Sequence, residues 1–206
     1  MTWVCQLSVA EFAGLGRHAP APRPSCSRCG EAMAFDGSYP REVREGGVVH
    51  RIFVRRARCR RCHVGEALAP DFLVRRRRDS TRSIAAAVLQ HALPDLPRDA
   101  QQLYEGVPRR TQRSWRQRFS ARADDLAACL NAFCTSWGAI PPVRAATPVD
   151  RAVEAIGALF RVADRRWSVP PGFVLANVVV GGQLLTSRAD LPHPDLPLSL
   201  GRSRAP

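Results

Sequence analysis

The chain has 206 residues, of which 31 are basic and 18 acidic, so its formal net charge is +13. This length suits one compact domain or two small ones, and a hydrophobic content of 45% allows a globular core. No apolar run reaches the roughly 18 residues of a membrane span, and the N-terminus lacks the basic start of a signal peptide, so we expect a cytoplasmic protein without membrane contact.

Residues 1–25 begin with a short amphipathic stretch that includes Val4, Val9 and Phe12. They continue into Ala-Pro-Arg-Pro, where each proline restricts the residue before it to an extended conformation. This segment is therefore expected to be an N-terminal lead-in rather than a packed element.

Two CxxC motifs follow, Cys26-Ser-Arg-Cys29-Gly and Cys59-Arg-Arg-Cys62-His. Each motif places two thiolates on one tight loop, and two such loops supply the tetrahedral four-sulfur shell that zinc prefers. In a reducing cytoplasm paired cysteines favour metal over disulfide. We therefore predict one structural Zn²⁺ bound by Cys26, Cys29, Cys59 and Cys62. Whether His63 replaces one of the cysteines stays open.

Between the motifs, Gly46-Gly47 predicts a tight hairpin turn with both glycines at positive φ. The flanking segments, Arg41–Glu45 and Val48–Arg58, have the composition of strands. A hairpin would bring the second cysteine pair back beside the first. Residues 26–78 are thus expected to form a zinc ribbon.

After Arg78 the hydrophobic period becomes helical. Asp79 or Ser80 can cap a first helix, and a second is expected over residues 98–105. Pro108 suits the first position of a third helix, whose buried face we expect to contain Val107, Thr111, Trp115 and Phe119. A further helix, 120–137, either follows this one or continues it. The remaining Cys129 and Cys134 lie on it among apolar neighbours and are expected to be core residues.

Residues 79–138 are therefore predicted to be a helical domain of helix-turn-helix type, in which the third helix enters the major groove. Arginine can bond guanine, and glutamine adenine, through two hydrogen bonds. The residues near the start of the third helix are the candidates for base contacts: Arg109, Arg110, Gln112 and Arg113. Those better placed for phosphate groups are Arg75, Arg76, Arg77, Arg78, Arg116 and Arg118.

Thr147-Pro148-Val149-Asp150 is typical of a helix start, and a helix to about residue 163 is expected, with Val149, Val153, Ile156 and Phe160 on its buried face. Residues 173–185 are apolar, and the pattern does not decide between helix and strand. We treat 139–188 as a C-terminal helical segment without an assigned role, and 189–206 as a disordered tail.

All 31 basic residues are arginine, a bias that a GC-rich coding sequence can produce without function. The distribution of charge is more informative than its total. Residues 41–78 contain 12 arginines against 4 acidic residues, and residues 79–122 contain 8 against 4. The excess charge thus lies where the ribbon and first helices are expected, which favours a polyanionic partner.

The segment from Cys26 to about Phe119 resembles an actinobacterial family of zinc-ribbon plus helix-turn-helix proteins found in or near mobile elements, akin to the N-terminal regions of some transposases. The likeness is in both CxxC motifs, in Ala67-Leu-Ala-Pro-Asp-Phe-Leu73, and in Pro108 through Trp115-Arg-Gln-Arg-Phe119. Leu175-Ala-Asn177 and Gly181-Gly-Gln-Leu-Leu185 extend it toward the C-terminus. The resemblance implies zinc binding, DNA binding and a role in transposition or its regulation.

The sequence thus predicts an α+β protein, a small zinc ribbon of β-hairpins followed by a mainly helical helix-turn-helix domain. We expect a nucleoid-associated, non-catalytic binder of specific double-stranded DNA. A homodimer and a transposase or recombinase partner stay open. The alternatives are a truncated or accessory component of such an enzyme and a zinc-ribbon RNA-binding protein. A strand-transferase core is disfavoured because Asp150, Glu154 and Asp164 lie on an ordinary helix surface.

Overall fold

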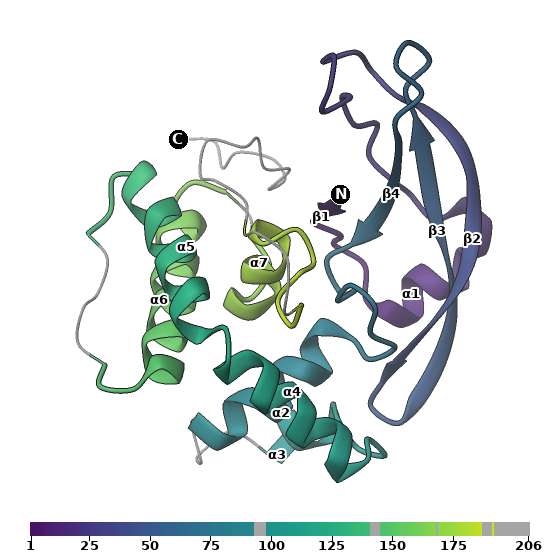
Figure 1. Ribbon diagram of the computed structural model, residues 1–206. Helices are drawn as coiled ribbons and strands as arrows, with labels where there is room; N and C mark the ends of the chain where they lie inside the picture. Colours follow the sequence, from purple (N-terminus) through teal and green to yellow (C-terminus); the bar gives the residue numbers. More distant parts are fainter. Residues whose placement is uncertain (93–97, 141–144, 168, 187–190, 192–206) are drawn as a thin grey trace.

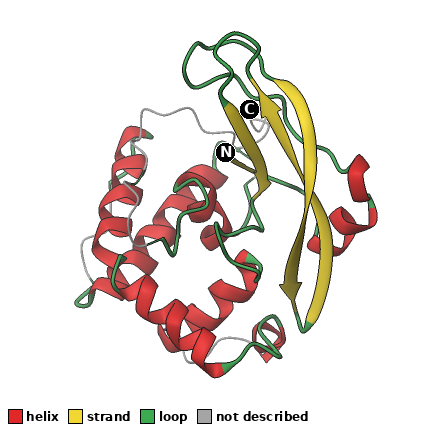
Figure 2. Ribbon diagram, turned by 45° about the vertical axis from the view of Figure 1, so that its right-hand side comes forward, coloured by secondary structure: helices red, strands yellow, loops and turns green. Residues whose placement is uncertain are grey.

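A computed structural model describes residues 1–92, 98–140, 145–167, 169–186 and 191. As predicted, the fold is mixed α/β, with a four-stranded sheet along one side of the molecule and most helices on the other (Figures 1 and 2). The strand order is β1-β4-β3-β2. The strands are β1 (Thr2–Trp3), β2 (Ala34–Glu45), β3 (Val48–Arg58) and β4 (Gly65–Pro70).

The hairpin of β2 and β3 is the longest part of the sheet, and its turn is the predicted one. Gly46 and Gly47 have φ angles of +56° and +78°, which a turn matching the twist of the strands requires. On its β3 side, strand β4 pairs with one end of that strand, Arg55–Arg58, next to the second cysteine motif. The other end of the hairpin extends toward the helices, where Gly46 N–H donates to the carbonyl of Leu103 at 3.0 Å.

The N-terminal segment differs from the expected lead-in because it is part of the packed structure. Strand β1 pairs in parallel with β4, and helix α1 (Val9–Gly14) begins with a capping box between Ser8 and Glu11. Its buried Phe12 packs edge-on against Phe72 with the ring centroids 5.3 Å apart. The apolar face of this short helix thus completes a core cluster on the sheet, which local sequence could not indicate.

Helix α2 (Thr81–Ala92) begins as predicted, since the Ser80 hydroxyl accepts a hydrogen bond from Ser83 N–H at 3.0 Å. Helix α3 (Arg98–Gln102) is shorter than the expected 98–105 and ends in turns that lead to Gly106. Helix α4 (Arg109–Ser120) has Pro108 just before it rather than at its first position. Helix α5 (Ala123–Ser136) is separate from α4.

Helix α6 (Pro148–Asp164) has the predicted cap, in which Thr147 Oγ1 accepts from Asp150 N–H. Of its predicted buried face, Ile156 is buried, whereas Val149, Val153 and Phe160 are only half-buried. The face is built instead mainly from Ala152, Ala155, Ala158, Leu159 and Ala163. Small residues let α6 pack closely on its neighbours, a preference that a search for large apolar residues misses.

Residues 172–186 form helix α7 (Gly172–Val179) and a turn, which resolves the choice between helix and strand. The largest core cluster runs through α2, α4, α5, α6 and α7, so no core boundary separates the expected units 79–138 and 139–188. Buried Asn177 joins this core to the sheet, because its Nδ2 donates to the carbonyls of Asp71 and Leu73. Nearly all of the expected tail, 189–206, lies outside the described residues.

None of the described helices is both long and apolar enough to cross a membrane.

Candidate metal centre and basic surface

The four predicted cysteine ligands meet at one end of the sheet. All four sulfur atoms lie within 4.8 Å of one another, with 3.2 Å between Cys26 and Cys62 and 3.5 Å between Cys29 and Cys59. Sulfur atoms bound tetrahedrally to zinc are about 3.8 Å apart, given Zn–S bonds of about 2.3 Å. The cluster therefore has the composition and the size of a four-thiolate metal site.

The two CxxC loops have the same backbone hydrogen bonds. Gly30 N–H donates to the Cys26 carbonyl at 2.8 Å, and His63 N–H donates to the Cys59 carbonyl at 3.0 Å. Gly30 and His63 both have positive φ, +75° and +56°. His63 thus occupies the turn position that glycine holds in the first loop. Among the described residues, the group that could hold a metal ion consists of the four cysteines without His63.

Backbone amides point at the sulfur atoms. The N–H of Arg28 is the main reason why the pKa of Cys26 is lowered to about 6, and the N–H of Cys62 lowers the pKa of Cys59. In contrast, the bond to Cys26 raises the pKa of Cys62 to about 12. A metal ion would replace the protons that the crowded thiols share, and the amides would then stabilise the thiolate charges. The donor set therefore suits a soft divalent cation.

The other cysteines have a different environment. Burial raises the pKa of Cys5 and of Cys129 to about 11 and also raises that of Cys134. Cys134 belongs to the helical core and Cys129 packs against it, which confirms the prediction that both are core residues.

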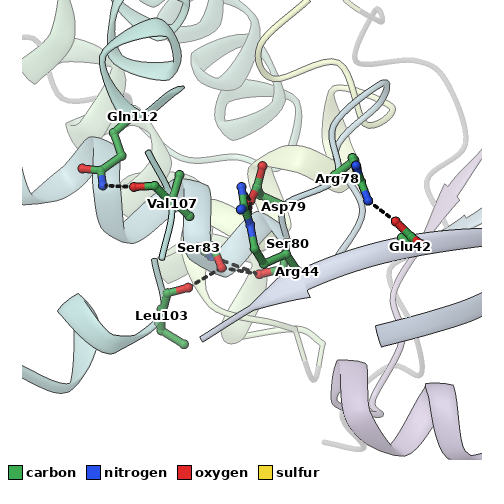
Figure 3. A network of polar contacts seen from close by, with 9 residues as sticks. All are labelled: Glu42, Arg44, Arg78, Asp79, Ser80, Ser83, Leu103, Val107 and Gln112. Atoms are coloured by element: carbon green, nitrogen blue, oxygen red, sulfur yellow. Dashed lines mark hydrogen bonds and ion pairs between the residues drawn. The ribbon is translucent and has the colours of Figure 1, made fainter. Parts of the chain in front are cut away.

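The arginine run 75–78 connects the sheet to α2, and side chains of β2 hold it in place. The Arg41 guanidinium donates to the carbonyls of Val74, at 2.9 Å, and Arg77, at 2.5 Å. Arg78 forms an ion pair with Glu42 (Figure 3). The run is thus a shaped loop in which Arg75, Arg76 and Arg78 are exposed.

Arg44 and Asp79 extend this network toward α2, with 2.7 Å between the guanidinium and the carboxylate (Figure 3). The Leu103 carbonyl accepts from Ser83 of α2 as well as from Gly46 of the hairpin. These contacts tie the sheet, the arginine run and the turn before α4 together. The segment that leads into α4 is therefore held by hydrogen bonds against both the hairpin and α2.

Helix α4 buries Trp115 and Phe119, as predicted. A cleft of about 440 Å³ separates the helix from the arginine run, and its lining includes Arg77, Arg110 and Ser114. Burial, together with the positive charge of Arg118, lowers the pKa of Arg77. The arginine run 75–78 and α4, which the sequence predicted as the phosphate-contacting and base-contacting elements, thus border one cationic cleft.

Not every residue proposed to contact DNA lies on the exposed face of α4. Arg109, Arg110 and Arg113 are exposed, but Gln112 is turned inward, and its Nε2 donates to the Val107 carbonyl at 2.8 Å (Figure 3). The expected base contact by Gln112 does not fit this arrangement, because the amide completes the turn before the helix.

Two other side chains of α4 differ from the expected grouping. Arg116 is half-buried, and together with Arg113 and Gln117 it lines a different cleft, which α4 shares with Thr147 and Asp150 at the start of α6. Gln117 is exposed and lies one turn after Arg113, on the same face. Helical periodicity measured from Trp115 and Phe119 could have selected Gln117 in place of Gln112.

A family model described as "Domain of unknown function (DUF6431)" matches residues 26–106. The matched segment contains both CxxC loops, the arginine run, α2 and α3, and it ends just before α4. No match was found among curated proteins or among solved structures.

Proposed function

We propose that the protein is a non-catalytic, double-stranded DNA-binding protein with one structural Zn²⁺. The observation that carries this proposal is the cleft shared by the arginine run and α4. A loop with several exposed guanidinium groups lies across this cleft from α4, which presents Arg110 to it. The helix also exposes Arg113 and Gln117, which line the neighbouring cleft between α4 and the start of α6. This combination suits duplex DNA, because the loop can bind phosphates while the helix reaches base edges in the major groove.

Zinc has a structural role in this proposal. Four cysteine ligands leave no open coordination position for a water or a substrate. The cluster of buried residues around the site is small, with Met33, Ala57 and Leu68 as its members besides the ligands. The metal would hold the two loops together where this core is too small to do so.

The acidic residues of α6 support a non-catalytic role. The Asp150 carboxylate is bonded to Thr147 at the helix cap, and Glu154 accepts from Ala145 N–H. Both carboxylates thus hold the start of α6. We propose that any link to transposition, which rests on the resemblance to mobile-element proteins, is through DNA recognition rather than strand transfer.

Selection of bound sequences from a random duplex pool, followed by titration of the selected duplex, tests this function. We expect duplex to bind more tightly than single strands or RNA, with affinity falling steeply as salt increases. Arg113→Ala should relax the preferred sequence, at a cost of about 1–3 kcal/mol for the best site. Replacing Arg76 and Arg78 should weaken all duplexes alike.

Arg165→Ala is a suitable control, because this exposed arginine lies at the opposite end of α6 from the start that faces α4. Equal weakening by all of these variants on every sequence would exclude base recognition by α4. A preference for RNA would replace the proposal by the RNA-binding alternative.

A further inference from the structure

Four arginines and two phenylalanines form a second cationic surface on the hairpin. The guanidinium groups of Arg23 and Arg55 lie over the ring of Phe35, 5.7 and 5.0 Å from its centroid. Those of Arg17 and Arg51 lie over the ring of Phe53, at 5.1 and 5.9 Å. We call these residues the arginine–phenylalanine face: Arg17, Arg23, Phe35, Arg51, Phe53 and Arg55.

The backbone explains how these residues come together. Residues 51, 53 and 55 alternate along β3 and therefore share one face of the sheet. Arg55 fixes the N-terminal segment on that face, because it donates to the carbonyls of Ala19, at 3.3 Å, and Arg17, at 3.0 Å. The contacts of Arg55 thus place Arg17 beside the hairpin.

The other three arginines are available for a ligand. Arg17, Arg23 and Arg51 are exposed, and the ion pairs found in the described part of the chain involve none of them. A guanidinium over an aromatic ring keeps its N–H groups directed outward in its own plane. The rings thereby orient the arginines in advance, which reduces the entropy lost when an anion binds.

The ligand that fits is a row of phosphates. The guanidinium groups form two clusters, Arg17 with Arg51 at Phe53 and Arg23 with Arg55 at Phe35. Residues 51 and 55, one in each cluster, are about 13 Å apart along the strand, so the available arginines of the two clusters can reach separate phosphates of one DNA strand. Base stacking suits this face less well, because guanidinium groups already cover Phe35 and Phe53. The face therefore presents hydrogen-bond donors rather than bare rings.

This surface is continuous with the arginine run. Arg51 also lines a cleft of about 700 Å³ formed with Glu42 of β2 and with residues 75–78. We infer that the arginine–phenylalanine face binds the phosphate backbone of the same duplex that α4 contacts, so that the DNA footprint extends past the arginine run and along the hairpin. This inference rests on the proposed function.

The double variant Arg17→Gln, Arg51→Gln tests the inference. Two phosphate contacts account for about 2 units of the slope of log affinity against log salt. On a 30-base-pair duplex we expect the slope to become shallower by this amount and the affinity to fall at least tenfold at moderate salt. A duplex just long enough for α4 and the arginine run should bind the variant and the unaltered protein alike.

The matched control is Arg165→Gln, Arg166→Gln, which removes the same charge from two exposed positions at the end of α6. A third variant, Phe53→Leu, keeps all the charge but removes the ring that both Arg17 and Arg51 lie over. It should lose part of the affinity for the long duplex. Circular dichroism and metal content establish that each variant is folded.

The outcomes separate this inference from the proposed function. If Arg113→Ala changes sequence preference while the hairpin double variant binds like its control, the inference is wrong and the proposed function stands. A double variant that loses affinity for single strands but not for duplex also overturns the inference. If the unaltered protein binds no duplex, both proposals fall.

Discussion

Substitution of one buried cysteine ligand isolates the contribution of the metal to the fold. Cys59 is fully buried, and Cys59→Ser changes its volume little while replacing a thiolate by a hydroxyl that binds soft metals poorly. We expect metal content to fall from one ion per chain to well below one. Both CxxC loops, residues 26–30 and 59–63, should then unfold.

The size of this destabilisation depends on the interactions other than metal binding that stabilise the two loops. Fixing the backbone of their ten residues costs about 10–20 kcal/mol, at 1–2 kcal/mol each. Burial of Met33 and Leu68 provides about 3–6 kcal/mol. A structural zinc site contributes about 10–16 kcal/mol, which offsets the remainder. Without metal the loops should therefore be unstable by several kcal/mol.

Trypsin digestion followed by mass spectrometry can detect this local unfolding, since Arg28, Arg60 and Arg61 lie inside the two loops. We expect fast cleavage after these residues in Cys59→Ser and slow cleavage in the control Cys129→Ser, whose sulfur lies on α5 outside the cluster. The helical signal in circular dichroism should persist, because the large helical core contains no proposed ligand. Full metal occupancy with an unchanged digestion pattern in Cys59→Ser would refute the reasoning.

Three further substitutions test the core. Asn177→Ala should lower the free energy of unfolding by about 2–4 kcal/mol in urea titration, because two buried carbonyl groups lose their donor; a change below 1 kcal/mol would contradict the assigned role. Burial raises the pKa of Asp71 to about 7, so the folded state binds a proton that the unfolded state releases near pH 4. Stability should thus fall as pH rises from about 4 to 7. In Asp71→Asn that fall should be smaller over about pH 5.5–7.5. Metal content can be measured for both proteins across this range, so that unequal loss of metal is excluded as the cause. Trp115→Ala should lower the free energy of unfolding by about 3–5 kcal/mol. The variant should bind DNA less well only because a smaller fraction of it is folded. Added salt should therefore change its folded fraction no more than that of the control Arg165→Ala.

Features of local structure that depend on a few neighbouring residues were predicted correctly from the sequence. The turn at Gly46-Gly47 needs only two residues that accept positive φ, and the caps at Ser80 and Thr147 need only a hydroxyl near the first free N–H groups. The CxxC spacing fixes the shape of each loop, so the four ligands could be named together before their distances were known.

Predictions that depend on orientation were less successful. Gln112 has the residue type of a base-reading side chain, but the turn of α4 directs it to the Val107 carbonyl. The buried face of α6 was assigned to Val149, Val153, Ile156 and Phe160, but of these only Ile156 is buried, and alanines make up most of the face. In both cases the direction of a side chain depends on where the neighbouring element lies.

The sequence by itself determined the α+β composition, the cysteine set that could hold a metal and the concentration of positive charge in residues 41–122. These properties are local, because loop geometry and charge depend on residue type and spacing. Only the tertiary structure decided that residues 1–25 pack on the sheet, that one core joins α2 to α7, and that the arginine run faces α4. Such contacts join residues far apart in the chain, and their geometry arises from packing that no short stretch of sequence specifies.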